Sequence, residues 1–357
     1  RKGEKIMTRK EILTGIFSLV APGTLLRDAL GRIQEAGLGA LIVIGDEESL
    51  KYMIDGGFNL NVDFTPQKLY ELSKMDGALM VSENLRKISY ANIQLQPKAT
   101  IHTDESGTRH RTADRVAKQT GNLVLAVSER RNKITIYKGS FRYEILDMKD
   151  ILAKTSQALM ALEKYATAIH HHLTNLTILE FDNMVTVNEV VEGIKKYGLL
   201  YRITDELDEY ILELGSEGRL IVLQYEELMQ GIKEDLYDLI RDYNNSEETV
   251  DKIFSDIRKL NKEELLELGK IAHVMGFGKA YSNFDKRITP RGYRILSEIK
   301  RITKKDIELL IKAFNDLPEI LDATSEDIAK IKGISKFKAS SIVRGLKRLR
   351  NTLIMER

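Results

Sequence analysis

The chain has 357 residues, 43% of them hydrophobic and 30% charged, which excludes a disordered protein and is enough for about two or three folded domains. The absence of cysteine excludes disulfides, thiolate metal sites and cysteine nucleophiles, and the net charge of +2 indicates no partner by itself. No apolar run approaches the roughly 18 to 20 residues that span a bilayer, and residues 1–7 lack the apolar stretch of a secretory signal. We therefore expect a cytoplasmic protein with no membrane partner.

Residues 1–147 alternate helical and strand patterns and are expected to form an α/β domain, with helices around one mixed central sheet. Helices are predicted through Leu26 and Ile33, after Pro22-Gly23-Thr24 and with Gly37 and Gly39 as the stop, from Thr65 to about Met75, and from about Thr112 to Thr120 with Gly121 as the cap. Strands are predicted at Ala40–Ile44, Ala78–Val81, Ile88–Leu95, Leu123–Val127 and Ile134–Tyr137, the last two joined in a hairpin.

Residues 148–300 are expected to form an all-α helical spine, which serves as a spacer or an assembly region. Apolar residues recur there at alternating spacings of three and four, which is typical of a helix face that packs against another helix. They are Leu159, Leu162, Ala166, Ile169, Leu173 and Leu176. Further helices are predicted from Val187 to Ile194 and from Leu223 to Ile240, with breaks at residues 244–246 and 276–278.

Residues 301–357 are expected to form a C-terminal helix-hairpin-helix domain. Thr303 with Asp306, and Thr324 with Ser325, are typical of helix N-termini, and the glycine-containing segment 331–339 precedes a further helix. Such a hairpin presents backbone N–H groups that bind a phosphate without reading any base. Residues 328–357 carry nine basic residues against one acid, which is typical of a nucleic-acid contact, although a solvated basic helix face has the same charge.

The segment Ser106–Ala113 is the densest candidate for chemistry, because it runs from a loop into a helix N-terminus. It offers a glycine that permits a tight turn, two hydroxyl donors and two forked cations, which together suit a polyphosphate. These residues are Gly107, Thr108, Thr112, Arg109 and Arg111. The alternative is a basic surface loop whose arginines pair with Asp104 and Glu105.

Two other turns carry polar residues that have either a structural or a functional interpretation. In Asp76-Gly77-Ala78 the Asp-Gly pair favours a turn for conformational reasons alone, or Asp76 is a metal ligand or a partner for a reacting hydroxyl. The turn Ser128–Arg131 either reaches the same phosphates or is solvated. Three other patterns are discounted: His170, His171 and His172 fan out around a helix and cannot share one metal, and neither a P-loop nor a Rossmann glycine motif is present.

Asp76-Gly77-Ala78, followed by Gly107-Thr108-Arg109-His110-Arg111-Thr112-Ala113, resembles the paired DGA and RHR motifs of diadenylate cyclase domains. The order of the three regions is similar to that of the DisA family of DNA integrity scanning proteins. This resemblance implies that two ATP molecules condense into cyclic di-AMP and two pyrophosphates, with Mg or Mn as the cation. It also implies that two cyclase domains face each other, so that the 3′-hydroxyl of one ATP attacks the α-phosphate of the other.

The resemblance assigns roles to individual residues. Asp76 would bind the metal and align the 3′-hydroxyl, and ATP would be held by Gly77, Ala78, Leu95, Thr108, Arg109, His110, Arg111, Thr112 and Ser128. DNA would contact Lys332, Gly333, Ser335, Lys336 and Lys338. The usual hairpin has a second glycine where this chain has Ser335, so a weaker phosphate contact is expected there. The family further implies an octamer and affinity for branched or recombination-type DNA.

Two alternatives remain open from the residues. The first is a DNA-binding scaffold whose α/β domain senses ATP without consuming it. The second is a nucleotidyltransferase that modifies DNA ends, whose nucleophilic lysine motif is matched in letters by Lys74-Met75-Asp76-Gly77. The Arg-His-Arg motif favours the cyclase over the second alternative.

Overall fold

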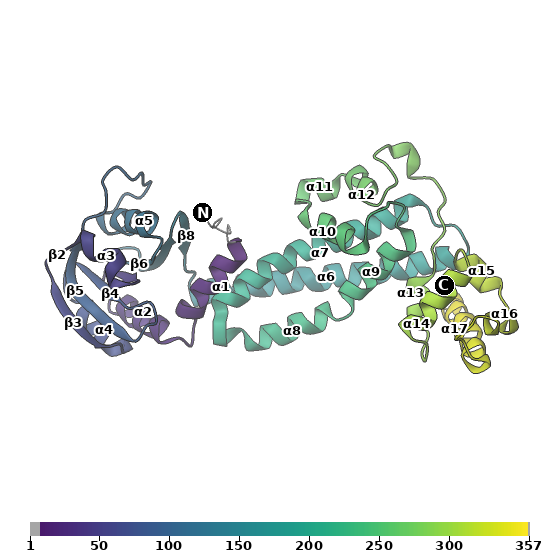
Figure 1. Cartoon of the computed structure of the whole chain (residues 1–357), viewed down its shortest axis with the longest axis horizontal. Coiled ribbons are helices and arrows are strands. Elements are labelled where there is room, and N and C mark those ends of the chain that lie inside the picture. The colour runs from purple at the N-terminus through teal and green to yellow at the C-terminus, as the bar shows by residue number, and fades with distance from the viewer. Residues whose placement is uncertain (1–7, 356–357) are drawn as a thin grey trace. The chain divides into compact units, whose positions relative to one another are not determined.

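The computed structural model describes residues 8–355, and its helices and strands are labelled in Figure 1. The chain divides into two compact units. The first unit holds the residues up to Ser156 together with Asp208–Val222, and the second holds Gln157–Leu207 together with the residues from Leu223 onward. Residues 1–7, which carry the basic N-terminal segment, lie outside the described residues.

The first unit is built on one eight-stranded mixed sheet, as predicted. The strands follow the order β2-β5-β4-β1-β6-β7-β8, with β3 paired to β5, and only β1 and β4 are parallel to each other. Their bounds are β1 Ala40–Ile44, β2 Ile54–Asp55, β3 Phe58–Asp63, β4 Ala78–Val81, β5 Lys87–Leu95, β6 Leu123–Ser128, β7 Lys133–Lys138 and β8 Phe141–Glu144. All five predicted strands are confirmed, and β2, β3 and β8 are additional.

Helices cover both faces of this sheet (Figure 1). One face packs against α1 Arg9–Val20, α2 Leu25–Glu35 and α4 Pro66–Leu72, and the other packs against α3 Glu47–Leu50, the short 3-10 helix η1 Lys51–Met53 and α5 Thr108–Thr120. Leu30 and Val116, on opposite faces, are both fully buried. The sequence analysis predicted α2, α4 and α5 and missed α1, whose buried residues Leu13 and Phe17 belong to the same core as α2.

Helix α5 begins four residues before the predicted start at Thr112. Gly107 is its N-cap, in an extended conformation, so Arg109, His110 and Arg111 lie in the first helical turn and not in a loop. The prediction was wrong because this turn contains no apolar residue until Ala113, and the apolar period that marks a helix therefore starts late. Its predicted end is confirmed, since Gly121 is a left-handed C-cap.

The spine is helical, as predicted. Its helices are α6 Met148–Phe181, α7 Val187–Leu214, α8 Arg219–Met229, α9 Ile232–Tyr243, α10 Val250–Lys259, α11 Lys262–Leu266 and α12 Leu268–Val274, with short 3-10 segments at η2 Gly215–Gly218 and η3 Tyr281–Asn283. The predicted seam of α6 is confirmed, because Leu162, Ile169 and Leu176 are buried against residues of α7 and α9. The seam is thus filled from within the chain.

Two spine predictions were wrong in extent. The helix predicted at Val187–Ile194 continues through Lys195, Lys196 and Gly198 to Leu214. The single helix predicted from Leu223 to Ile240 is two helices, α8 and α9, which are interrupted at Gly231 in a left-handed conformation.

The C-terminal helices form a separate apolar core. They are α13 Tyr293–Ser297, α14 Lys304–Ala313, α15 Leu317–Asp322, α16 Ser325–Ala329 and α17 Lys336–Met355. Both predicted caps are confirmed as capping boxes, Thr303 with Asp306 and Thr324 with Asp327. Side chains of α6 and α9 hold the start of α13: Asp242 accepts the backbone N–H groups of residues 292–294, and Arg294 pairs with Glu180.

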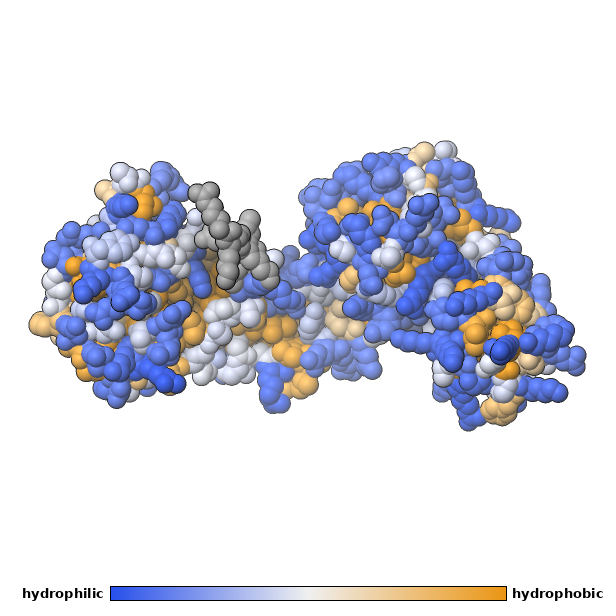
Figure 2. All heavy atoms as spheres, viewed as in Figure 1, coloured by the Kyte–Doolittle hydropathy of each residue, from blue (hydrophilic) through white to orange (hydrophobic). Residues whose placement is uncertain are grey.

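The visible surface is largely hydrophilic, with small apolar patches (Figure 2). Across residues 8–355, no single helix is both long and apolar enough to cross a membrane. Helices α1 and α2 pass that test only as a bent pair, and most of their apolar residues are buried in the core of the first unit.

Candidate functional site

The register of the sheet brings four predicted or newly identified positions to one edge. Ala78 pairs with Leu41 and with Ile93, so the turn before β4 lies between the residue before β1 and the end of β5. Ala40 pairs with Val127, so the end of β6 lies on the other side of β1. Leu95, Asp76, Gly39 and Ser128 therefore follow one another across this edge.

Arg109 connects helix α5 to the same edge. A Cβ atom at Gly39 would lie 2.1 Å from a guanidinium nitrogen of Arg109, so this side chain packs directly on the glycine backbone. Gly39 was predicted only as a helix stop, and the structure gives it a second role. It leaves the space that Arg109 occupies at the sheet edge.

A pocket of about 390 Å³ opens beside this contact. Four of the predicted ATP-binding residues line it: Thr108, Arg109, His110 and Ser128. Seven further charged residues line it, from the segment before α5, the β6–β7 turn, the start of β7, and β8: Glu105, Glu129, Arg130, Arg131, Lys133, Arg142 and Glu144. Four other predicted residues, Asp76, Gly77, Ala78 and Leu95, lie at the same edge without lining the pocket. Arg111 and Thr112 lie on α5 and also do not line it.

Some charged side chains around the pocket form ion pairs and others do not. Arg109, Arg130 and Arg131 line the pocket and form no ion pair within residues 8–355. The acids expected to neutralise this segment do not pair with its arginines, because Glu105 bonds Arg142 at 2.6 Å and the exposed Asp104 forms no ion pair with Arg109 or Arg111. The structure therefore contradicts the interpretation of this segment as a self-neutralised basic loop, and the pocket suits a multiply charged anion.

The Asp76-Gly77 turn combines a structural glycine with an uncommitted carboxylate. Gly77 has φ +87°, and a Cβ atom there would lie 2.7 Å from the carbonyl oxygen of Ile93, so the fold itself requires glycine. Asp76 is exposed, and its carboxylate forms no hydrogen bond or ion pair in the described part of the chain. It is free to bind a cation or a hydroxyl at the sheet edge.

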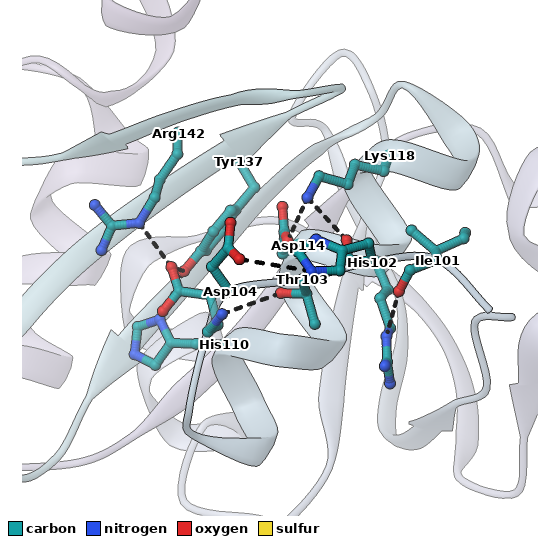
Figure 3. A network of polar contacts seen from close by, with 11 residues as sticks. Ile101, His102, Thr103, Asp104, His110, Asp114, Lys118, Tyr137 and Arg142 are labelled. Carbon is teal, nitrogen blue, oxygen red and sulfur yellow. Dashed lines mark hydrogen bonds and ion pairs between the residues drawn. The ribbon is translucent and has the colours of Figure 1, made fainter. Parts of the chain in front are cut away.

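A hydrogen-bonded network behind the pocket was missed by the sequence analysis (Figure 3). Arg142 Nε donates to Glu105 Oε1 at 2.6 Å, the Tyr137 hydroxyl donates to the same oxygen at 2.8 Å, and His110 Nδ1 lies 2.9 Å from that hydroxyl. Tyr137 is fully buried in β7, and its place in an apolar strand indicates only a core residue. Arg142 lies on β8, which was not predicted. Nothing in the sequence indicates that these side chains lie together.

The surroundings of this network shift the pKa values of its side chains. Burial lowers the pKa of His110, and the nearby Arg142, Arg109 and Arg131 lower it further, while Glu105 opposes them. Burial and the hydrogen bond to Glu105 raise the pKa of Tyr137. Burial would raise the pKa of Glu105, but the hydrogen bonds from Arg142 and Tyr137 outweigh it and lower the pKa. The resting network thus contains an ionised Glu105, a protonated Tyr137 and a neutral His110.

Lys74 does not have the properties of a nucleophile. Its ammonium pairs with Glu71 at 2.8 Å and lies over the ring of Tyr70. The hydrogen bond to Glu71 raises the pKa of Lys74, whereas a nucleophilic lysine needs a lowered pKa. The lysine motif required by a DNA-end nucleotidyltransferase is therefore matched in letters only.

The C-terminal core contains two hairpins with matching sequences. The segments are Ile299-Lys300-Arg301-Ile302-Thr303-Lys304 and Ile331-Lys332-Gly333-Ile334-Ser335-Lys336. Arg301 and Gly333 occupy equivalent positions and both have positive φ, +73° and +106°. Ser335 has no positive φ and caps α17 by accepting the N–H of Lys338 at 3.2 Å, so serine replaces the usual glycine without backbone strain.

The two hairpins differ in the charge at their second helices. Asp306 caps α14 and neutralises that N-terminus, while α17 has no acid in its first turn. Lys338, at the position equivalent to Asp306, pairs with it at 2.8 Å, so this lysine is already engaged. Lys332 and Lys336 are exposed and form no ion pair in the described chain, and Phe337, which lies between Lys336 and Lys338, is 62% exposed.

Comparisons with protein families cover nearly the whole chain. Residues 27–141 match the nucleotide-binding region of the DisA bacterial checkpoint controller, residues 145–284 match its linker region, and residues 293–348 match a SAM-like helix-hairpin-helix tandem. The three matches follow the order of the regions described above.

Curated relatives match over their full length. The DNA integrity scanning protein DisA of Clostridium kluyveri is 43% identical over 350 residues, which cover 98% of this chain and 99% of the relative. DisA of Clostridium botulinum strain Eklund 17B is 44% identical over 354 residues, with 99% of each chain covered.

Among solved structures, a hypothetical membrane spanning protein from Bacillus cereus matches with a TM-score of 0.31 and 28% identity, over 34% of this chain and 62% of that one. A double mutant of DacA from Staphylococcus aureus matches with a TM-score of 0.29 and 22% identity, over 39% of this chain and 89% of that one.

The unpaired arginines predict how the pocket binds an anion. Replacement of Arg109 by Gln should weaken the binding of inorganic triphosphate by about 10- to 100-fold, because one charge-assisted contact is worth about 1.5–3 kcal/mol. Isothermal titration calorimetry measures this change. Arg86→Gln is the matched control, since Arg86 is exposed and does not line the pocket. Equal losses in the two variants would contradict the assignment.

Proposed function

The chain belongs to the DisA family and is a diadenylate cyclase with a DNA-binding domain, and we propose that it joins two ATP molecules into cyclic di-AMP across two facing copies of the chain. Two pyrophosphates leave in this reaction. The observation that carries the proposal is the sheet edge itself, where a pocket with unpaired arginines lies beside the free carboxylate of Asp76.

The pocket would hold the triphosphate of one ATP. Arg109, Arg130 and Arg131 supply positive charge, and the first-turn amides of α5 together with the hydroxyls of Thr108 and Ser128 supply neutral donors. Phosphoryl transfer depends on positioning and on charge neutralisation more than on covalent help from the protein. A rigid, cationic pocket at the edge of a sheet meets both demands.

Asp76 would bind the divalent cation and align the attacking 3′-hydroxyl. Mg²⁺ takes one or two protein carboxylates together with substrate phosphates and waters, so a single exposed aspartate fits it. Within residues 8–355 no group of three or more metal-binding side chains occurs, which agrees with a cation held jointly with ATP. When bound, Mg or Mn supplies charge neutralisation at the phosphates.

The reaction would need two copies of the chain. One pocket takes one triphosphate, while the product contains two adenylates, so a second ATP must come from a facing pocket. We propose that assembly, up to the octamer, uses exposed apolar residues of the spine. The seam of α6 is already buried within the chain, whereas α8 has no buried residue and exposes Leu220 and Leu223.

DNA would bind at the second hairpin of the C-terminal domain. The first turn of α17 contains no acid of its own, and Lys332 and Lys336 are free to contact phosphates. Contacts of this kind read the backbone and not the bases, so little sequence preference is expected, with branched DNA as the preferred form. The first hairpin is a weaker candidate because Asp306 already occupies its helix terminus.

Product analysis tests the proposed reaction. The protein incubated with ATP and Mg or Mn should form cyclic di-AMP and pyrophosphate, identified by ion-exchange chromatography and mass spectrometry. Asp76→Asn should lower the rate by at least about 100-fold, because the metal and the hydroxyl lose their alignment. Asp46→Asn is the control, since Asp46 is an exposed aspartate beyond the opposite end of β1. ATP that binds but stays intact would favour the ATP-sensing scaffold instead.

Salt dependence tests the DNA site. The double variant Lys332→Gln with Lys336→Gln should reduce the slope of log K against log salt by about two, because each lost phosphate contact lowers it by about 0.9. Fluorescence anisotropy with a labelled four-way junction measures this slope. Lys252→Gln with Lys259→Gln, on α10, removes the same charge elsewhere. An unchanged slope in the hairpin variant would exclude these lysines from the interface.

A further inference from the structure

The network behind the pocket fixes the direction of each of its hydrogen bonds. Glu105 accepts from Arg142 Nε and from the hydroxyl of Tyr137, and an ionised carboxylate has no proton to give. The single hydroxyl proton of Tyr137 is therefore committed to Glu105. Toward His110, 2.9 Å away, the Tyr137 oxygen acts only as an acceptor.

This direction determines the tautomer of His110. A ring nitrogen that bonds an acceptor must carry a proton, so the hydrogen is on Nδ1. In a neutral imidazole the other nitrogen, Nε2, then has a lone pair and no proton. Nε2 has no partner among the described residues, and His110 lines the pocket. The ring thus offers a hydrogen-bond acceptor to a pocket in which cations outnumber carboxylates, since five basic side chains and three acidic ones line it: Arg109, Arg130, Arg131, Lys133 and Arg142 against Glu105, Glu129 and Glu144.

The lone pair on Nε2 of His110 cannot form a hydrogen bond with a phosphate ligand. The non-bridging oxygens of a triphosphate are themselves acceptors, so they cannot bond a lone pair on Nε2. The conflict ends when Nε2 gains a proton from solvent, because the imidazolium donates from both nitrogens. Its positive charge is then balanced by the phosphates on one side and by Glu105, through Tyr137, on the other.

We propose that binding of the ATP triphosphate in this pocket takes up one proton at Nε2 of His110, and that Glu105 and Tyr137 are positioning residues that impose this requirement by keeping Nδ1 protonated. The inference rests on the proposed function in one respect, namely that the pocket holds the triphosphate. The proton comes from solvent, and no covalent bond of the nucleotide changes.

The groups around His110 support this coupling. The groups with the largest effect on it are the cations Arg109 on its own helix, Arg131 in the β6–β7 turn and Arg142 on β8, and the carboxylate of Glu105. The same pocket is also lined by two further cations and two further carboxylates, Arg130, Lys133, Glu129 and Glu144. Burial and the three arginines lower the pKa of His110 in the free protein, so the ring is neutral at neutral pH. Bound phosphates place negative charge among the arginines and reverse this effect. The affinity of the pocket for the ATP triphosphate should therefore fall as pH rises above neutrality.

Calorimetry in two buffers measures the proton directly. The full chain is titrated with 3′-deoxy-ATP, which lacks the attacking hydroxyl, at pH 8.0 with excess Mg²⁺ in HEPES and in Tris. At this pH the phosphate itself is ionised, since its last pKa is about 6. The dependence of the observed enthalpy on the ionisation enthalpy of the buffer gives the number of protons taken up. We expect a value approaching one per site.

Variants separate the positioning role from binding. In Tyr137→Phe the ring of His110 is free to carry its proton on Nε2, so uptake should fall toward zero while the nucleotide still binds. His110→Gln supplies a neutral amide donor and should also show no uptake. Tyr143→Phe is the matched control, because its hydroxyl donates to Glu213 and not to this network, and it should keep the uptake of the parent.

The outcomes distinguish the two levels of the proposal. Nucleotide binding by the parent without proton uptake overturns the coupling and leaves the cyclase assignment intact. Undiminished uptake in Tyr137→Phe overturns the positioning role of the tyrosine. Failure of the parent to bind 3′-deoxy-ATP overturns the placement of ATP in this pocket, and the coupling with it.

Discussion

The contact between Arg109 and the backbone of Gly39 is the one on which the site depends. It joins the first turn of α5 to the start of β1, and the sheet register then brings Asp76, Leu95 and Ser128 to the same edge. A side chain at position 39 would displace the arginine, because its Cβ atom would lie 2.1 Å from the guanidinium. Two motifs that lie about thirty residues apart in the sequence thus act at one place because the residue before β1 is a glycine.

Ion pairing and position together identify the charged residues that are available to ligands. Glu105, Lys74, Lys338 and Arg294 all have close ion-pair partners. Asp76, Arg109, Lys332 and Lys336 have none within residues 8–355. Exposed charges elsewhere, such as Arg86, are also unpaired in the described part of the chain, so it is the location of these four residues at the sheet edge or at the second hairpin that makes them candidates for ligand contact.

Sequence patterns predicted the sheet, the spine and the C-terminal hairpin because these features depend on local periodicity. The five predicted strands and the seam from Leu159 to Leu176 are of this kind. The start of α5 was missed because its first turn is polar, and the network of Glu105, Tyr137 and Arg142 was missed because its members come from three separate elements. Gly39 was seen as a helix stop, since a close approach from a distant side chain leaves no trace in the local sequence.

The central claim is that two copies of the chain contribute one ATP each to a single reaction. It is tested by co-expressing the parent with Asp76→Asn at varied ratios and measuring cyclic di-AMP formation per total protein. Each product molecule needs two intact halves, so the rate should follow the square of the parent fraction. A rate that falls in proportion to the parent fraction would contradict the claim, because it would mean that one chain completes the reaction alone.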